Sequence, residues 1–210
     1  MCTNIRPWTT AAFAATLALP DPELKQGDQN MSEPTIIDGP EGRKIAYRRA
    51  GSGSSVLLLH GITEGSETFL PVIDNLAADH DVVAIDMAGH GLSSAPEIVG
   101  LEQMAMDAGL LVQTLGLENP LLVGHSYGAI IAAALASNGL GCGAVLVDQA
   151  FELSAFRELL LANREQLQEN FHPFYDQMFE SFGMDKLGER DRKLLSHMHA
   201  QADRDFVLAQ

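Results

Sequence analysis

Four short, mainly apolar runs that alternate with helical segments restrict the fold of this chain more than any other feature. The runs span residues 56–60 (VLLLH), 81–86 (DVVAID), 121–123 (LLV) and 143–147 (GAVLV). Such runs are typical of parallel strands that are buried on both faces. Helical spacing of apolar residues lies between them, at 68–77, 101–115 and 127–137. The alternation predicts an α/β fold, with right-handed βαβ units on a mostly parallel sheet and helices on both faces.

The chain before the first run has two parts. Residues 35–38 and 44–49 are expected to pair as a β-hairpin around the Gly-Pro-Glu-Gly turn between them. Residues 1–30 differ from the rest, and their thin apolar run at 11–20 makes only a weak secretory signal. We expect translation to begin at Met31 and residues 1–30 to be a disordered extension. A cleaved signal peptide and an amphipathic arm are the alternatives.

Residues 151–210 hold no comparable apolar run, but much amphipathic helix rich in Leu, Glu and Gln. Pro173, Gly183 and Gly188 are expected to divide this segment into three helices. We therefore expect a core at 31–150 and a helical cap or lid at 151–210. A chain of 210 residues is long enough for one domain with a small appendage.

The acidic balance of the chain excludes several classes of partner. The formal net charge is −15, and residues 51–156 contain twelve acidic residues but no lysine or arginine. Such a surface repels polyphosphates and anionic lipids, which argues against nucleic-acid binding and membrane docking. The expected partner is a small apolar or neutral substrate. The two cysteines, Cys2 and Cys142, cannot build a disulfide framework, which favours the cytoplasm.

The strongest chemical motif is Gly124-His125-Ser126-Tyr127-Gly128, a G-x-S-x-G between an apolar strand and a helix of small residues. This setting predicts a nucleophile elbow, a tight turn that exposes a serine hydroxyl at the carboxyl edge of the sheet. A Cβ on either glycine is expected to clash with neighbouring backbone. The alternative is a serine that only caps the following helix. We interpret Ser126 as a nucleophile.

A second motif, His60-Gly61-Ile62-Thr63, follows the first apolar run. A loop at this position can aim a backbone N–H at the crevice beside the serine. We expect the N–H groups of Ile62 and Tyr127 to form an oxyanion hole. His60 is interpreted as a buried, hydrogen-bonded residue at a strand end rather than as a catalytic one.

A third motif, DMAGHGLS, begins at Asp86 after the second apolar run. Its Gly89-His90-Gly91 segment lacks the third glycine and the directly following helix of a dinucleotide-binding loop. No phosphate-binding loop motif occurs elsewhere in the sequence. We interpret the segment as a structural turn and predict no cofactor.

Together these motifs resemble those of the α/β-hydrolase superfamily, and most of all its capped, esterase-like members with a D-x-x-G-H-G-x-S box. The resemblance covers about residues 35–150, and the segment that follows resembles the family's helical cap. It implies that Ser126 is the nucleophile and that the amides of Ile62 and Tyr127 bind the oxyanion. A serine in place of aspartate argues against haloalkane dehalogenases and most epoxide hydrolases. The implied activity is hydrolysis of a carboxylic ester, lactone, thioester or C–C bond, without a cofactor.

The chain departs from this family in its last part. The family supplies an acid after the seventh strand and a histidine base after the eighth, but the cap occupies the residues that remain here. We expect a form truncated at its C-terminus, whose open sheet edge favours self-association. Asp148, at the end of the fourth apolar run, is a candidate acid, and an ordinary strand-end aspartate is the alternative.

No base can be assigned from the sequence. His172, His197 and His199 lie in the expected cap, where we interpret each as an exposed residue. His197 and His199 are too close in sequence for two zinc ligands on one helix face, and we predict no metal site. Three alternatives to an active serine hydrolase stay open: a ligand- or partner-binding protein without catalysis, a truncated inactive fragment, and a split enzyme completed by another chain.

Overall fold

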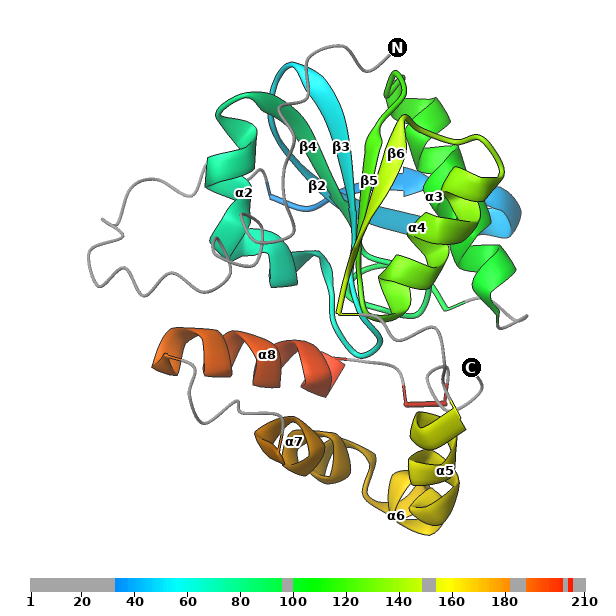
Figure 1. Cartoon of the computed structure of the whole chain (residues 1–210), viewed down its shortest axis with the longest axis vertical. Coiled ribbons are helices and arrows are strands. Elements are labelled where there is room, and N and C mark those ends of the chain that lie inside the picture. The colour runs from blue at the N-terminus through cyan, green and yellow to red at the C-terminus, as the bar shows by residue number, and fades with distance from the viewer. Residues whose placement is uncertain (1–32, 96–99, 149–153, 182–187, 202–203, 206–210) are drawn as a thin grey trace.

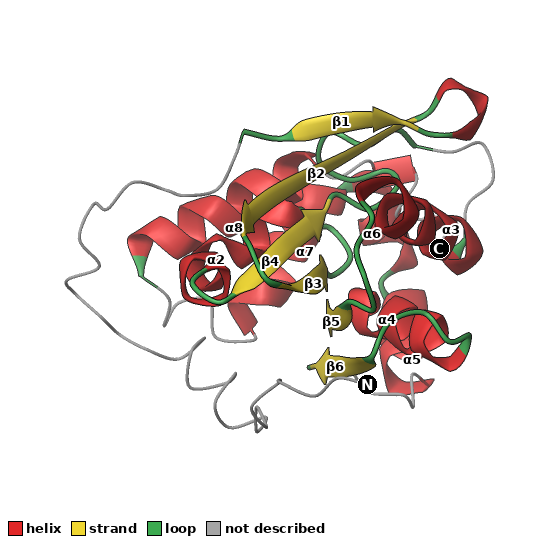
Figure 2. Ribbon diagram, turned by 90° about the horizontal axis from the view of Figure 1, so that it is seen from above, coloured by secondary structure: helices red, strands yellow, loops and turns green. Residues whose placement is uncertain are grey.

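The computed structural model describes residues 33–95, 100–148, 154–181, 188–201 and 204–205. The predicted extension at 1–30 lies outside the described residues, and so does Gly183. Six strands form one sheet in the order β1-β2-β4-β3-β5-β6 (Figures 1 and 2). They are β1 (Thr35–Asp38), β2 (Lys44–Gly51), β3 (Ser54–Leu59), β4 (His80–Ile85), β5 (Leu121–His125) and β6 (Gly143–Val147).

The first two strands form the predicted hairpin, and the remaining four are parallel to one another. Only Ser52 and Gly53 separate β2 from β3, yet β4 lies between these two strands and pairs with both. Gly51 and Gly53 have φ values of 78° and 122°. A Cβ on Gly51 would lie 2.2 Å from the carbonyl oxygen of His80, so this sharp passage requires glycine.

Helices cover both faces of the sheet, which confirms the predicted α/β architecture (Figure 1). On one face, α3 and α4 bury Leu111 and Ile131 against the strands. On the other face, η2 and α2 bury Phe69 and Ile73. The core helices are η1 (Pro40–Gly42), η2 (Ser66–Phe69), α2 (Leu70–Ala77), α3 (Leu101–Leu115) and α4 (Tyr127–Ser137).

The helix predicted at 68–77 consists of two helices: the 3-10 helix η2 ends at Phe69, and the α-helix α2 begins at Leu70. Pro71 occupies the first turn of α2, where its missing N–H has no helical partner to lose. The predicted end of α3 is confirmed at Gly116, whose left-handed φ of 64° stops the helix.

Three carboxylates of the core pair with arginines of β2 and of the residue before it. This follows from the absence of lysine and arginine between residues 51 and 156. The ion pairs join β2 to three other elements, so they tie the hairpin to the rest of the core. They are Arg43–Asp107, Arg48–Glu67 and Arg49–Asp81, each with an N–O distance of 2.7 Å.

The described part of the cap holds four helices rather than the three predicted. Pro173 does not break a helix, because it lies in the first turn of α7 and costs no hydrogen bond there. The chain instead leaves the helical conformation at Asn163 and Asn170. The helices are α5 (Ser154–Ala162), α6 (Arg164–Glu169), α7 (Phe171–Ser181) and α8 (Glu189–Gln201).

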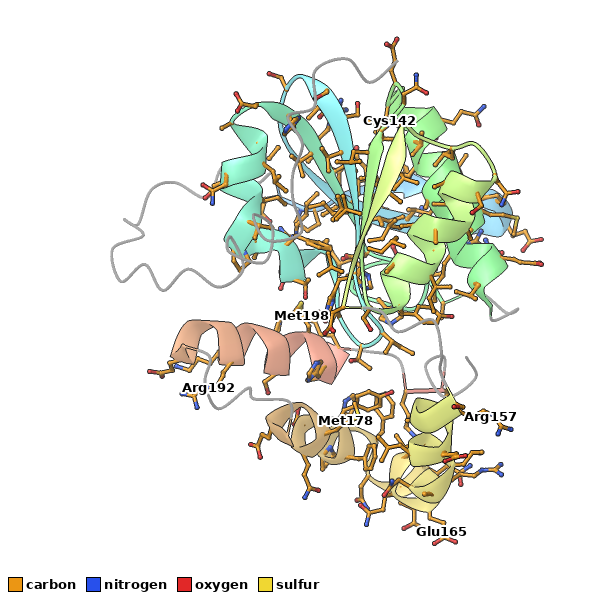
Figure 3. The ribbon with its side chains drawn as sticks, viewed as in Figure 1. Cys142, Arg157, Glu165, Met178, Arg192 and Met198 are labelled. Carbon is orange, nitrogen blue, oxygen red and sulfur yellow. The ribbon has the colours of Figure 1, made fainter. Side chains whose placement is uncertain are left out.

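The cap lies beyond one end of the sheet, where the loop after β3 emerges (Figure 1). Its α8 packs against η2, and the hydroxyl of Thr68 donates a hydrogen bond to the sulfur of Met198. Figure 3 shows Met198 on the side of α8 that faces the core. None of the helices in the described ranges is long and apolar enough to cross a membrane.

Candidate active site

Ser126 stands in a strained turn between β5 and α4. Its φ of 50° and ψ of −118° lie outside the regions that residues with a Cβ ordinarily adopt. The Ser126 N–H donates to the carbonyl of Val147 at the end of β6, with an N–O distance of 2.9 Å. The carbonyl of Ser126 accepts from Ala129 in the first turn of α4, also at 2.9 Å. The strand, the tight turn and the helix therefore have the backbone arrangement that the sequence predicts around Ser126, whose role as a nucleophile stays a prediction.

The two glycines of the motif are required by close backbone contacts. A Cβ on Gly124 would lie 2.3 Å from the carbonyl oxygen of Gly128. A Cβ on Gly128 would lie 2.2 Å from the carbonyl oxygen of Leu59 and 2.5 Å from that of His60. Side chains cannot approach backbone this closely, so the start of α4 reaches the end of β3 only because residue 128 is glycine.

Backbone strain marks the carboxyl ends of three neighbouring parallel strands. Thr63 follows β3 with φ of 65°, Ser126 follows β5 with φ of 50°, and Asp148 follows β6 with φ of 51°. Such conformations are costly for residues other than glycine, and they gather at functional sites. The ligand site of an open α/β sheet also lies at the carboxyl ends of its strands. Both observations point to this edge as the active site.

His60 and His90 shape the loops that follow β3 and β4. Each ring accepts a backbone N–H at Nε2, from Met87 to His60 at 2.9 Å and from Thr63 to His90 at 3.2 Å. Each must therefore carry its proton on Nδ1 and donate it to a backbone carbonyl, at Gly61 and Ala88 respectively. With rings 5.1 Å apart and both side chains buried, the two histidines hold the loops together.

The third motif also has a structural role. The buried carboxylate of Asp86 accepts the N–H of Ser66 at 2.7 Å and that of Leu92 at 3.1 Å. Gly89 and Gly91 have φ values of 75° and 52°. A Cβ on Gly91 would lie 2.4 Å from the Asp86 carboxylate. The turn therefore closes around the Asp86 carboxylate, which is consistent with a structural turn.

Burial of His90 predicts a loss of stability in mild acid. Burial, together with the nearby His60, lowers the pKa of His90 from 6.5 to about 4. The unfolded chain then binds a proton that the folded chain refuses, so stability falls as pH falls from 6.5 through the folded pKa. The shift corresponds to about 3 kcal/mol of unfolding free energy. The free energy of unfolding, measured with urea at pH 7 and at pH 4, should fall less in His90→Asn than in the wild type. His197→Asn, which changes an exposed histidine, should lose as much stability as the wild type.

The two proposed oxyanion donors come from different segments of the chain. Tyr127 is the first residue of α4, directly after Ser126. Ile62 lies in the loop after β3, and its side chain packs against the apolar cap residues Leu167, Phe171 and Tyr175. The cap therefore presents apolar side chains to the loop that carries the Ile62 N–H.

Glu64 is a site residue that the sequence did not single out. Its side chain is 5% exposed, and one oxygen, Oε2, accepts both the N–H of Gly61 at 2.8 Å and the ring Nδ1–H of His125 at 3.1 Å. The carboxylate thus connects the loop that holds Ile62 to the residue before Ser126. The sequence shows only a glutamate in a polar loop, and its burial depends on contacts made 61 positions away.

A comparison with protein families agrees with this geometry. A family model described as alpha/beta hydrolase fold matches residues 54–178, which is more than half of the chain. The chain belongs to the α/β-hydrolase fold family.

Curated relatives of this α/β hydrolase match less than half of the chain. It is 43% identical over 87 residues to the 2-(acetamidomethylene)succinate hydrolase of Mesorhizobium japonicum, a match that covers 40% of this chain and 31% of that protein. It is 39% identical over 99 residues to the dihydrolipoyllysine-residue acetyltransferase component of the acetoin cleaving system of Cupriavidus necator, covering 46% and 26%. The matched segment therefore spans less than a third of either relative.

Solved structures share the fold over a longer stretch. A hydrolase from Pseudomonas aeruginosa superposes with a TM-score of 0.72 at 19% identity, covering 85% of this chain and 71% of that one. An esterase from Exiguobacterium antarcticum gives 0.71 at 23% identity, covering 84% and 73%. At these identities the likeness shows the fold.

The candidate acid of this α/β hydrolase and the histidines of the cap differ in their exposure to solvent. Asp148 is exposed at the end of β6, and its charge acts on His125. His197 is exposed, as expected, but His199 is only 1% exposed, which corrects the expectation for that residue. Residues two apart point to nearly opposite sides of a helix, so α8 directs one outward and the other inward. His199 contacts Asp176 of α7 at 3.4 Å, and His172 is half-buried against Phe171.

A cavity of about 110 Å³ lies where α8 meets the core. Glu64 is among its lining residues, whereas Ser126, Ile62 and Tyr127 are not. Carboxylates dominate its charged groups. The lining residues are Arg48, Glu64, Gly65, Glu67, Asp86, Gly91, Leu92, Met198 and Gln201.

Proposed function

We propose that this α/β hydrolase is a serine hydrolase that cleaves an ester-like bond in a small apolar or neutral substrate. The observation that carries the proposal is the backbone of Ser126, with φ of 50° and ψ of −118° at the end of β5. A strained serine between a buried strand and a helix N-terminus is the arrangement of a nucleophile elbow. A serine that only caps a helix has extended backbone and does not need this strain.

The proposed reaction has two stages. Ser126 Oγ attacks the acyl carbon after a base takes its proton, and the backbone N–H groups of Ile62 and Tyr127 stabilise the oxyanion. Collapse of this intermediate breaks the bond from the acyl carbon to the alkoxide oxygen, which takes up the proton held by the base and leaves as the alcohol, while the acyl group stays on Ser126. Water then attacks the acyl-enzyme, releasing the carboxylic acid and restoring the serine.

Two further observations support the substrate class. The side chains that pack against Ile62 from the cap are apolar, and the chain carries a strongly negative net charge that disfavours anionic ligands. The name of the relative from Mesorhizobium japonicum, a hydrolase, supports the proposed reaction class rather than the substrate class.

Covalent labelling with a fluorophosphonate probe tests the proposal. The wild-type chain should be labelled at Ser126, and Ser126→Ala should not be labelled at all. Ser137→Ala is the matched control, because Ser137 is an exposed serine at the other end of α4, and it should be labelled like the wild type. A folded wild-type chain that the probe does not label would favour a binding protein without catalysis, or an enzyme completed by another chain.

A further inference from the structure

The Glu64 carboxylate joins two parts of the active site that are far apart in the sequence. Gly61, whose N–H it accepts, directly precedes Ile62. His125, whose ring Nδ1–H the carboxylate also accepts, directly precedes Ser126. A single oxygen atom, Oε2, therefore contacts the neighbours of both the proposed oxyanion donor and the proposed nucleophile.

The packing leaves this carboxylate little freedom. A Cβ placed on Gly61 would lie 3.1–3.2 Å from three atoms of the Glu64 carboxyl group, so the group rests directly on the Gly61 backbone. The next residue before Glu64, Thr63, holds a strained φ of 65° and is tied to His90 through its N–H. Ile62 lies between Gly61, which is bound to Glu64, and Thr63, which is bound to His90. A displacement of Glu64 is therefore expected to move Ile62 as well.

The charges of the site favour an ionised pair. Burial alone would raise the pKa of Glu64, but its hydrogen bond to His125, the charge of that ring and the Gly61 N–H outweigh burial and lower the pKa. Burial would lower the pKa of His125, but the hydrogen bond and charge of Glu64, with the charge of Asp148, raise it.

Other titratable groups surround this pair on each side. His60 follows β3, His90 and Asp86 follow β4, and His199 of α8 faces Glu64 from the cap. Burial lowers the pKa of His60, His90 and His199. Among these four histidines, His125 is therefore the one whose protonated form is favoured, and its partner is Glu64.

We propose that Glu64 is a positioning residue, which holds the loop bearing the Ile62 N–H in register with the Ser126 elbow by binding Gly61 and His125 together. The inference rests on the proposed function, since it assigns Ile62 and Ser126 their roles. Glu64 takes no part in bond making or breaking.

Glu64→Gln tests the inference, because glutamine keeps the shape of the side chain and loses the charge. The full chain is used, and Glu67→Gln is the matched control: it makes the same change three residues further on, at a carboxylate paired with Arg48. Three quantities are measured: the NMR titration of the His125 ring, the amide shifts of Ile62 and Tyr127, and the rate of fluorophosphonate labelling from pH 5 to pH 8.

In Glu64→Gln we expect the His125 pKa to fall, the Ile62 and Tyr127 amides to shift, and labelling to slow by about 10²-fold, the usual effect of a misplaced catalytic group. Glu67→Gln should leave all three at wild-type values. His125→Asn removes the hydrogen bond between His125 and Glu64 at its other partner, and it should slow labelling by a similar factor. This variant tests the inference if Glu64→Gln does not fold. The double variant should be no slower than the slower single variant.

Labelling of Glu64→Gln and His125→Asn at the wild-type rate would overturn the inference, and so would equal losses in Glu67→Gln. If the wild-type chain is not labelled, the proposed function fails on its own. The amide shifts then decide the inference separately: movement of both amides in Glu64→Gln but not in Glu67→Gln supports the link, and its absence refutes it.

Discussion

Gly128→Ala is expected to destabilise the chain by about 3 kcal/mol or more, a large part of the roughly 5–15 kcal/mol by which native domains are stable. The added Cβ would meet the carbonyl oxygens of Leu59 and His60 at 2.2 Å and 2.5 Å. These oxygens belong to backbone and cannot turn away, so α4 must separate from β3. Loss of the far-ultraviolet circular dichroism signal, or of soluble protein, would report this.

Gly109→Ala is the matched control for this substitution. Gly109 lies within α3, and a Cβ placed there meets no atom within 4 Å. Because alanine is the better helix former, this variant should gain about 0.5–1 kcal/mol. Equal effects of the two substitutions on urea unfolding would contradict the role assigned to the contact between α4 and β3.

Ser126→Gly and Ser126→Ala should separate function from strain. Both variants lose the hydroxyl, so each should lose at least about 10³-fold of any hydrolytic activity. Only glycine relieves the backbone at φ of 50° and ψ of −118°. We expect Ser126→Gly to be about 1–2 kcal/mol more stable than Ser126→Ala.

Thermal or urea unfolding of the two variants measures this difference directly. Ser137→Gly and Ser137→Ala provide the reference pair, because Ser137 ends α4 with its side chain exposed. There alanine should be the more stable variant, since glycine disfavours helix. The same order of stability at positions 126 and 137 would show that the elbow stores no strain.

The core of this fold could be predicted because its signals are local. The buried strands β3, β4 and β5 are continuous apolar runs, and Gly116 ends α3 where the sequence indicates. The run at 143–147 is a strand as well, but β6 is only partly buried because it lies at an edge of the described sheet. The elbow could be predicted for the same reason, since Gly124, Ser126 and Gly128 lie within five residues of one another. The steric need for both glycines was expected, and close backbone contacts account for it.

The features that could not be predicted depend on distant partners. Glu64 becomes a buried site residue through His125, which lies on another strand. His199 is buried because α8 turns that face toward α7 and the core. Pro173 was expected to break a helix, but its effect depends on where the helix begins, and α7 begins two residues before it. In each case the sequence shows the residue type and the tertiary neighbours decide its role.

The position of β4 between β2 and β3 has a consequence for how the chain folds. A nascent chain completes β2 and β3 before residues 80–85 exist, and only Ser52 and Gly53 separate these two strands. A glycine-containing connection of two residues is a strong hairpin signal. In the folded chain each of these strands pairs with β4 instead. The centre of the sheet therefore depends on contacts that close longer loops than a direct pairing of β2 with β3 would, and such contacts cost more chain entropy to form.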